Sequence, residues 1–376
     1  MRVLVWQWGR RGAGPRFAAE LARNFAAVPD TEALLSLAAG AEILQSAESP
    51  RCDLPFTTYG GAFGFGLRAL RSPLLVRPLA AWLRAQRVDA ALCAMPAPLD
   101  FVMAAALRRA RVPFAVVVHD ADAHPGDRFP MQMRLQHRLM HQADGLFALS
   151  THVADRLTQQ GRIAGRTLVT ASLPPFAFGQ PPPPAGAHGG PFRLLSFGRL
   201  LPYKGLDLLA DSLALLGPRP DLAVRVVGSG PETPVLGRLR ALPGVSVENR
   251  WVPEDEVGAL MAWADGLVLS HREASQSGVA AAAVAAGRWL VATRVGGLAE
   301  QLHANPMALM CDPTPASLAD GIVRVLAAMP PPAGMPDPQL AWTSVAGAMV
   351  AELRQLASAR AWAALPNQDL GTNLTS

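Results

Sequence analysis

The chain has 376 residues, half of them hydrophobic and 17% charged, and its net charge at pH 7 is +5. This length predicts two or more domains with sizeable cores. The composition argues against a membrane-spanning protein, because no apolar run reaches about 18 residues, the length of a membrane-spanning helix. The widely spaced Cys52, Cys93 and Cys311 suit neither a disulfide framework nor a zinc site.

Charge is distributed unevenly along the chain. Residues 1–180 contain 20 arginines and 13 acidic residues, whereas the remainder contains 14 basic and 16 acidic residues. The basic half is therefore the half expected to meet an anionic partner. Nucleic acid is not expected as that partner, because the sequence shows no zinc-finger, helix-turn-helix or aromatic-basic ladder pattern.

Strand-like and helix-like segments alternate in the first half. Strands are expected at residues 2–6, 90–94, 114–119 and 145–149, with helices such as 17–25 and 99–110 between them. This alternation implies right-handed crossovers and a parallel sheet. The first apolar run is too short for a signal peptide, and a Gly/Arg loop follows it in place of a cleavage site, so a cytoplasmic location is expected.

A glycine-rich loop, Gly9-Arg10-Arg11-Gly12-Ala13-Gly14, follows the first expected strand. Gly12 and Gly14 would let backbone N–H groups approach phosphates at the start of a helix. An ordinary tight strand-to-helix turn would use the same residues. The glycine spacing differs from the dinucleotide-binding fingerprint, so an oxidoreductase is not expected.

Residues 54–88 contain five arginines and no acidic residue. The arginines are Arg68, Arg71, Arg77, Arg84 and Arg87. Phe, Leu and Trp residues are interspersed with them, which is typical of a segment on an anionic membrane surface. An amphipathic helix whose apolar side is core fits the same pattern. Peripheral attachment to the inner face of the cytoplasmic membrane is therefore one of two interpretations.

His119 and Asp120 end an expected strand of the first half. A histidine there could orient a sugar or receive a proton from an acceptor, or it could be a structural residue. Asp120 and Asp122 resemble the paired carboxylates of a metal site, but two carboxylates alone cannot fix a metal. No metal is expected.

The clearest boundary is residues 181–190, where four prolines precede a glycine-rich stretch. We expect a first domain at residues 1–180, a linker at 181–190 and a second domain at 191–338. A helix at 339–365 is expected to pack back toward the first domain. The polar tail, 366–376, is expected to be disordered.

The alternation restarts after the linker. Strands are expected at residues 192–197, 223–227, 245–248, 266–269 and 289–292, and helices at 207–216, 254–263, 278–286, 317–327 and about 340–363. The fold class is therefore α/β, with two doubly wound domains in tandem. Ligands bind at the carboxyl ends of the strands in such sheets, so a cleft between the two domains is the expected site.

Lys204 is the only lysine among 34 basic residues. It lies with Arg199 in a glycine-flanked turn after strand 192–197. Arginine holds two oxygens in a planar fork, whereas lysine is a compact point charge, and the pair would suit a diphosphate. A basic surface turn in an arginine-biased sequence is the alternative.

Six motifs, of which this turn is the first, stand in a fixed order in the second half, at residues 197–205, 226–232, 252–257, 264–269, 273–279 and 292–300. In this respect the second half resembles the donor-binding domain of a GT-B-fold, family-4-like (group 1) glycosyltransferase. The first half matches more loosely, through the glycine-rich loop, His119-Asp120 and residues 143–150. Its role would be that of the acceptor-side domain.

The resemblance implies two Rossmann-like domains facing across a cleft. It also implies a metal-independent, retaining transfer of a sugar from a nucleotide-diphosphate donor, such as a UDP- or GDP-sugar. The acceptor would be a glycan or a lipid-linked sugar, as in the assembly of cell-surface polysaccharide or glycolipid. A polyprenyl-linked acceptor at a membrane would fit the basic first half.

The resemblance also assigns roles to residues. Arg199 and Lys204 would hold the donor diphosphate and stabilise the leaving phosphate. Glu273 would bind donor-sugar hydroxyls, and His119 would lie near the sugar. The remaining donor-binding positions are Gly12, Gly14, Gly198, Gly228, Gly230, Ser275, Gln276, Ser277, Gly278 and Val279.

One departure from the family pattern concerns the ribose. The second glutamate of the family's pair is replaced by alanine, whether the position is counted as Ala281 or Ala282. A catalytically inactive sugar-nucleotide or glycan-binding relative is therefore an alternative, and a GT-B-like epimerase or phosphorylase is a third. Glu300 is expected to cap the start of the helix that follows Gly296-Gly297.

Overall fold

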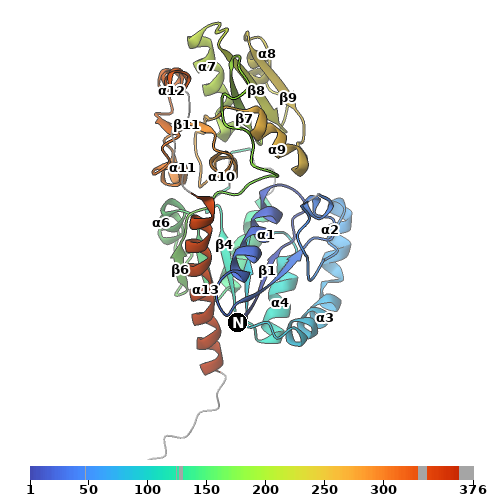
Figure 1. Ribbon diagram of the computed structural model, residues 1–376. Helices are drawn as coiled ribbons and strands as arrows, with labels where there is room; N and C mark the ends of the chain where they lie inside the picture. The colour runs from blue at the N-terminus through green and yellow to red at the C-terminus, as the bar shows by residue number, and fades with distance from the viewer. Residues whose placement is uncertain (47, 124, 127–129, 329–336, 364–376) are drawn as a thin grey trace, which may run out of the picture.

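The computed structural model describes residues 1–46, 48–123, 125, 126, 130–328 and 337–363, and the expected tail at 366–376 lies outside them. Two six-stranded sheets form separate α/β domains, one above the other in Figure 1. We call them the first and the second domain. The predicted fold class, two doubly wound domains of GT-B type, is confirmed.

The first sheet has the strand order β2-β1-β3-β4-β5-β6. Its strands are β1 (Arg2–Gln7), β2 (Glu32–Leu37), β3 (Ala90–Cys93), β4 (Phe114–Val118), β5 (Gly145–Ala148) and β6 (Thr167–Thr170). All its pairings are parallel. The helices are α1 (Ala13–Ala26), α2 (Gly61–Leu70), α3 (Ser72–Ala85), α4 (Asp100–Ala110), α5 (Pro130–Gln142) and α6 (Thr151–Gln159), with a short 3₁₀ helix η1 (Glu42–Gln45).

The second sheet has the order β12-β11-β10-β7-β8-β9 and is also parallel. Its strands are β7 (Phe192–Phe197), β8 (Leu222–Gly228), β9 (Val245–Asn249), β10 (Gly266–Leu269), β11 (Trp289–Thr293) and β12 (Ala308–Cys311). The helices are α7 (Leu206–Leu216), α8 (Pro234–Arg240), α9 (Glu254–Trp263), α10 (Gly278–Ala285), α11 (Gly296–Leu302) and α12 (Pro315–Ala327), with a 3₁₀ helix η2 (Pro202–Lys204).

The strand order decides where a ligand can bind. In each sheet the order reverses beside the first strand in sequence, between β1 and β3 and between β7 and β10. Loops that leave the carboxyl ends on either side of such a switch point separate and leave a crevice. The segments that begin at Trp8, Ala94, Gly198 and Ser270 are therefore the ones positioned to build a site.

Both faces of each sheet are covered by helices. The strands at the centre of the sheets, such as β1 and β11, are almost entirely buried, with Val3, Leu4, Val5 and Leu290 fully inaccessible. Covering both faces explains why these strands are continuous apolar runs without alternation. Each domain accordingly has two apolar clusters, one on each side of its sheet.

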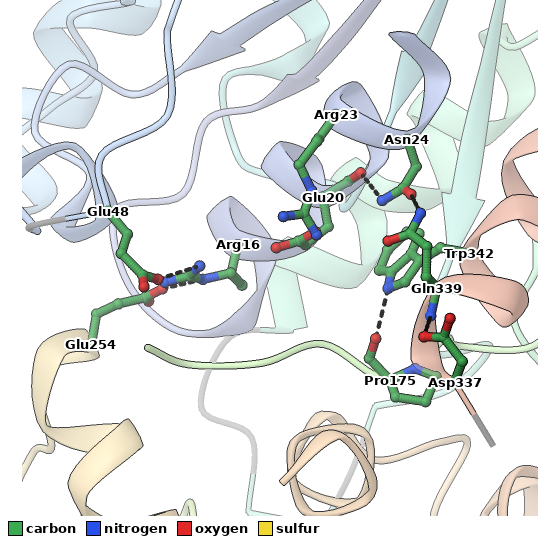
Figure 2. Close-up of polar contacts among 10 residues, drawn as sticks. All are labelled: Arg16, Glu20, Arg23, Asn24, Glu48, Pro175, Glu254, Asp337, Gln339 and Trp342. Carbon is green, nitrogen blue, oxygen red and sulfur yellow. Dashed lines mark hydrogen bonds and ion pairs between the residues drawn. The ribbon is translucent and has the colours of Figure 1, made fainter. Parts of the chain in front are cut away.

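The last described helix, α13 (Pro338–Ala363), lies against the first domain (Figure 1). Trp342 is buried there, and its indole N–H donates to the carbonyl of Pro175 at 2.6 Å. The Nε2 atom of Gln339 donates to Oδ1 of Asn24 in α1 at 2.7 Å (Figure 2). Met349 and Leu353 continue the same buried stripe into the first core.

Candidate active site

The glycine-rich loop is built around the side chain of Gln7, the last residue of β1. Gln7 is buried, and its Oε1 accepts the backbone N–H of Gly9 at 2.9 Å. A Cβ on Gly9 or Gly14 would lie 2.6 or 2.9 Å from Nε2 of Gln7, so a side chain at either position would displace the Gln7 amide. Gly12 precedes α1 with a φ of 81°, which disfavours other residues.

The start of α1 is suited to an anion. No side chain caps it, and its first turn contains no acidic residue. The first N–H groups of a helix carry partial positive charge and seek acceptors. The start of α1 could therefore accept an anion, and the phosphate-facing role of Gly12 and Gly14 stays a prediction.

Arg199 and Lys204 both lie beside the ring of Tyr203 in the turn that follows β7. The Arg199 guanidinium donates from Nη2 to the phenol oxygen of Tyr203 at 2.8 Å. The Arg199 guanidinium carbon and the Lys204 Nζ each lie 5.2 Å from the centre of that ring. Tyr203 thus holds the two cations in fixed positions, and no motif in the sequence assigned it this role.

The Lys204 ammonium is desolvated. Its Nζ lies 2.7 Å from Nε2 of the buried His271, which follows β10. Burial, then the charge of Arg199, lowers the pKa of Lys204 to about 7, while Asp120 of the first domain opposes the shift. A lysine near neutrality is easily charged by an arriving anion. A small pocket beside this pair is lined by Ser196, Phe197, Arg199, Lys204, Ser270 and His271.

Glycines allow the ends of three strands to come together at this point. A Cβ on Gly228 would lie 1.7 Å from the carbonyl oxygen of Gly198, and one on Gly230 would lie 2.3 Å from that of Leu200. Gly205, with a φ of 63°, packs as closely on the Ser270 carbonyl. Gly228 and Gly230 therefore shape the turn that carries Arg199 and Lys204 through backbone packing.

The segment between β10 and α10 faces the first domain. A Cβ on Gly278 would lie 3.4 Å from Cβ of Ala13 in the glycine-rich loop, and one on Gly198 would lie 3.6 Å from Cγ2 of Val279. The predicted donor-binding positions of the two domains are thus brought together. Glu273 lies exposed on the loop after β10.

Ser275 and Ser277 already have backbone partners. The Ser275 carbonyl accepts from the Ser150 hydroxyl at 3.0 Å, and the Ser277 N–H donates to Oε1 of Gln301 at 2.8 Å. Ser277 also caps α10, with its hydroxyl accepting from the N–H of Ala280. The Ser277 N–H is therefore already occupied by Gln301, and a donor-binding role for Ser277 stays a prediction.

His119 connects the two domains. Its Nε2 lies 3.0 Å from the Ala94 carbonyl, and its Nδ1 lies 3.3 Å from the amide nitrogen of Gln276. Burial lowers the pKa of His119, with Asp120 opposing. The two contacts fit a neutral ring with Nε2 protonated, in which Gln276 donates to Nδ1.

One ion-pair system and one cation–π contact join the first domain to the second. Arg16 of α1 donates from Nε to Oε1 of Glu254 in α9 at 2.7 Å, and its Nη1 lies 3.6 Å from Glu48 (Figure 2). Burial raises the pKa of Glu254, with Arg16 opposing. Arg11 of the glycine-rich loop lies over the ring of Trp251 of the second domain, 5.4 Å from its centre.

Glu300 caps a different helix from the one expected. It lies inside α11, and its carboxylate accepts the N–H groups of Thr151 at 2.7 Å and His152 at 2.8 Å, at the start of α6 in the first domain. The prediction that it caps the start of its own helix is wrong, because α11 begins four residues earlier, at Gly296. Sequence spacing cannot reveal a cap supplied from another domain.

The replacement of the second glutamate is accommodated by packing. Ala281 is 1% exposed and belongs to an apolar cluster of the first domain, while Ala282 is 2% exposed and belongs to the second-domain core. A glutamate at either position would be buried in apolar surroundings. A ribose contact from these positions is therefore absent from this chain.

Two Rossmann-like domains with a cationic pair at the facing strand ends define the GT-B class. The chain belongs to the group 1 glycosyltransferases, a family of transferase enzymes. A family model described as "Glycosyl transferases group 1" matches residues 191–328, and one described as "Glycosyl transferase 4-like domain" matches residues 12–172.

Similar proteins include the D-inositol 3-phosphate glycosyltransferase of Jonesia denitrificans, which is 35% identical over 141 residues. That match spans 34% of this chain and a third, 33%, of the curated relative. Among solved structures, HepE of Anabaena in complex with UDP and glucose has a TM-score of 0.64 at 18% identity, over 96% of this chain and 99% of that one.

The same fold also carries other chemistry. UDP-GlcNAc 2-epimerase of Neisseria meningitidis, bound to UDP-GlcNAc, has a TM-score of 0.57 at 11% identity, over 94% of this chain and all of that one. At these identities structural likeness shows the fold alone. The family models, and not the fold, separate the transferase from the epimerase.

Proposed function

We propose that the protein moves a sugar from a nucleoside-diphosphate donor to an acceptor held by the first domain. The observation that carries this proposal is the arrangement of Arg199 and Lys204 around Tyr203 at the end of β7. Together with the uncapped start of α1, it offers two cations and a helix terminus to one diphosphate. The complexes of HepE with UDP and with UDP-glucose favour a UDP-sugar donor.

The chemistry would be electrostatic. The bond between the anomeric carbon and the diphosphate oxygen breaks, a bond from that carbon to an acceptor oxygen forms, and the acceptor proton passes to the leaving phosphate. Arg199 and Lys204 stabilise the charge that develops on the leaving group. We further propose that the reaction needs no metal, because these cations do that work, and that it retains the anomeric configuration, on family resemblance.

Glu273 and His119 would hold the sugar. Glu273 lies on the loop that leads from β10 toward α10 and would bind donor hydroxyls. His119, fixed as the neutral ring between Ala94 and Gln276, would position the sugar and the Gln276 amide. Because both ring nitrogens of His119 already have hydrogen-bond partners, this residue is better suited to orienting the sugar than to transferring a proton.

The first experiment is calorimetric titration with UDP, GDP and ADP, with and without EDTA, on the wild-type chain and on Lys204→Ala. We expect one nucleotide to bind, unaffected by EDTA, with at least tenfold loss in the variant. Arg238→Ala is the matched control, since it removes an exposed cation of the same domain. Binding that survives Lys204→Ala would refute the phosphate assignment, and binding abolished by EDTA would refute metal independence.

A second candidate, a non-catalytic sugar-nucleotide-binding relative, is favoured by the buried Ala281 and Ala282. It predicts nucleotide binding without any release of UDP from a UDP-sugar, with or without acceptors. Measurable donor hydrolysis that Lys204→Ala abolishes would exclude it.

The acceptor we propose is a lipid-linked sugar or glycan, as in the assembly of cell-surface polysaccharide or glycolipid, used at the inner face of the cytoplasmic membrane. The excess of arginine in residues 1–180 supports it. Among the described helices, none has the length and apolarity needed to cross a bilayer. Attachment would therefore be peripheral.

A further inference from the structure

An apolar stripe lies exposed on α2 and the start of α3. Phe63 is 87% exposed, Leu67 42%, Leu70 80% and Leu74 74%. These four account for most of the large apolar side chains exposed in the described part of the chain, the others being Leu215, Trp251 and Leu340. Isolated exposed leucines need no explanation, but a contiguous set marks an interaction site.

The spacing places three of the four side chains on one face of α2. Phe63, Leu67 and Leu70 follow one another by four and three residues, which is the period of one helix face, and Leu74 lies in the first turn of α3. The opposite side of α3 is core, because Leu79 and Leu83 are buried and Trp82 packs against the first-domain cluster. The sequence left open whether this segment is a surface for a membrane or a helix packed on the core. The structure shows an exposed apolar stripe and a core-packed side on the same segment.

Positive charge borders this stripe. Arg71, between the two helices, and Arg77, one turn after Leu74, are exposed, and neither forms an ion pair within the described residues. Arg68 is turned inward over the ring of Phe56, at 5.2 Å, and Arg84 donates to the Arg109 carbonyl. Arg87 lies beyond the far end of α3, which stops at Ala85. Of the five arginines predicted for a membrane surface, Arg71 and Arg77 are therefore the ones beside the stripe.

The arginines beside the stripe favour an anionic bilayer over a second copy of the chain as its partner. A second copy would meet the stripe across a twofold axis, which brings the same surface patch to both sides of the contact. Residues 54–88 contain no acidic residue, so Arg71 and Arg77 would face arginines. A surface of apolar tails below anionic headgroups complements both the stripe and the arginines.

We propose that α2 and the start of α3 dock on an anionic bilayer, with Phe63, Leu67, Leu70 and Leu74 inserted at the headgroup boundary and Arg71 and Arg77 on lipid phosphates. The segment that leads to α2 leaves the carboxyl edge of the first sheet, where Ala38 bridges to Phe56. Figure 1 shows α2 on the side of the first domain that is nearer the second. A docked protein would therefore keep its cleft close to the lipid surface, which, if the proposed function holds, lets a lipid-linked acceptor reach it.

The test is co-sedimentation of the full chain with vesicles of phosphatidylglycerol or of phosphatidylcholine. We expect at least tenfold stronger partition to phosphatidylglycerol, weakening as salt rises. The triple variant Phe63→Ser/Leu70→Ser/Leu74→Ser should lose at least tenfold. Arg71→Ser/Arg77→Ser should abolish the preference for phosphatidylglycerol.

Two controls define the result. Leu215→Ser removes an exposed leucine of the second domain, and Arg238→Ser/Arg324→Ser removes two exposed arginines there, so both should bind like the wild type. Equal binding to both lipids, or unchanged binding of the triple variant, would overturn the proposal. A wild-type dimer that the triple variant dissociates would overturn it in favour of a second copy. Titration of the triple variant with UDP would show whether the donor site is intact. A failure of membrane docking can therefore be told apart from a failure of the proposed function.

Discussion

The Nζ atom of Lys204 lies 2.7 Å from the Nε2 atom of His271, so the single lysine of the chain meets a buried imidazole at the point where a diphosphate would arrive. An imidazole nitrogen that accepts from an ammonium holds it in one position without neutralising its charge. His271 itself is fixed through its carbonyl, which accepts from the Thr293 hydroxyl at 2.6 Å. The Lys204 ammonium is thus positioned by residues at the ends of the neighbouring strands β10 and β11.

Nucleotide affinity should depend on pH through Lys204. Its pKa in the free protein is about 7, lowered by burial and by Arg199, and a bound diphosphate would raise it. Binding then takes up a proton at any pH between the free and bound values. Affinity for UDP should therefore fall about tenfold per unit as the pH rises from about 7.5 to 9.

Titration at pH 8 in two buffers of different ionisation enthalpy would measure that proton directly. Lys204→Arg, whose guanidinium stays charged, should bind without proton uptake. Affinity that is constant from pH 7 to 9 in the wild type would contradict the assignment of the titrating group.

His271→Asn should weaken binding of UDP about tenfold, because the ammonium loses its buried acceptor and its fixed position. The change should also move the midpoint of the pH profile, which a purely structural role would leave in place. His303→Asn, at the exposed position directly after α11, is the control and should have no effect. The midpoint is read from the same calorimetric series.

Ala282→Glu should destabilise the protein and fail to tighten nucleotide binding. Family resemblance alone suggests the opposite, a restored ribose contact, but Ala282 is buried in the second-domain core. An unpaired carboxylate there costs on the order of 2 kcal/mol or more. Thermal unfolding would show a lower midpoint than for Ala316→Glu, which adds the same charge at an exposed helix start. Tighter UDP binding would show that the core has opened to the donor.

Glu300→Gln should loosen the contact between the domains. The carboxylate accepts two N–H groups at the start of α6, where negative charge is favoured by the helix dipole. Loss of that charge should cost about 1 kcal/mol of unfolding free energy. Asp320→Asn, which removes an exposed carboxylate from α12, should cost less. Hydrogen exchange at Thr151 and His152 should rise only in Glu300→Gln.

Sequence periodicity located the strands at the centre of both sheets, but it left out β2, β6 and β12. β6 is partly exposed along its length, and all three lie at or beside sheet edges, so their patterns are weak or short. The central strands are buried on both faces and give unmistakable apolar runs.

The sequence singled out Arg199 and Lys204, and the structure places both beside Tyr203, while their role in binding the donor stays a prediction. Tyr203 and His271 could not be assigned from sequence, because their importance comes from packing on Lys204 across two strand ends. The role of Glu300 depends on a contact with residues about 150 positions earlier, and the burial of Ala281 depends on the first domain. Only the tertiary structure brings these residues together.

The return of α13 to the first domain makes that domain discontinuous in sequence, with the second domain inserted between its two parts. Trp342 and Met349 fill a groove that residues before the linker cannot fill. A fragment ending near residue 180 would therefore expose apolar surface and aggregate, whereas the same fragment mixed with a peptide spanning α13 could be rescued by complementation. Synthesis on the ribosome has the same constraint, since the first domain reaches its final packing only after the second has been made.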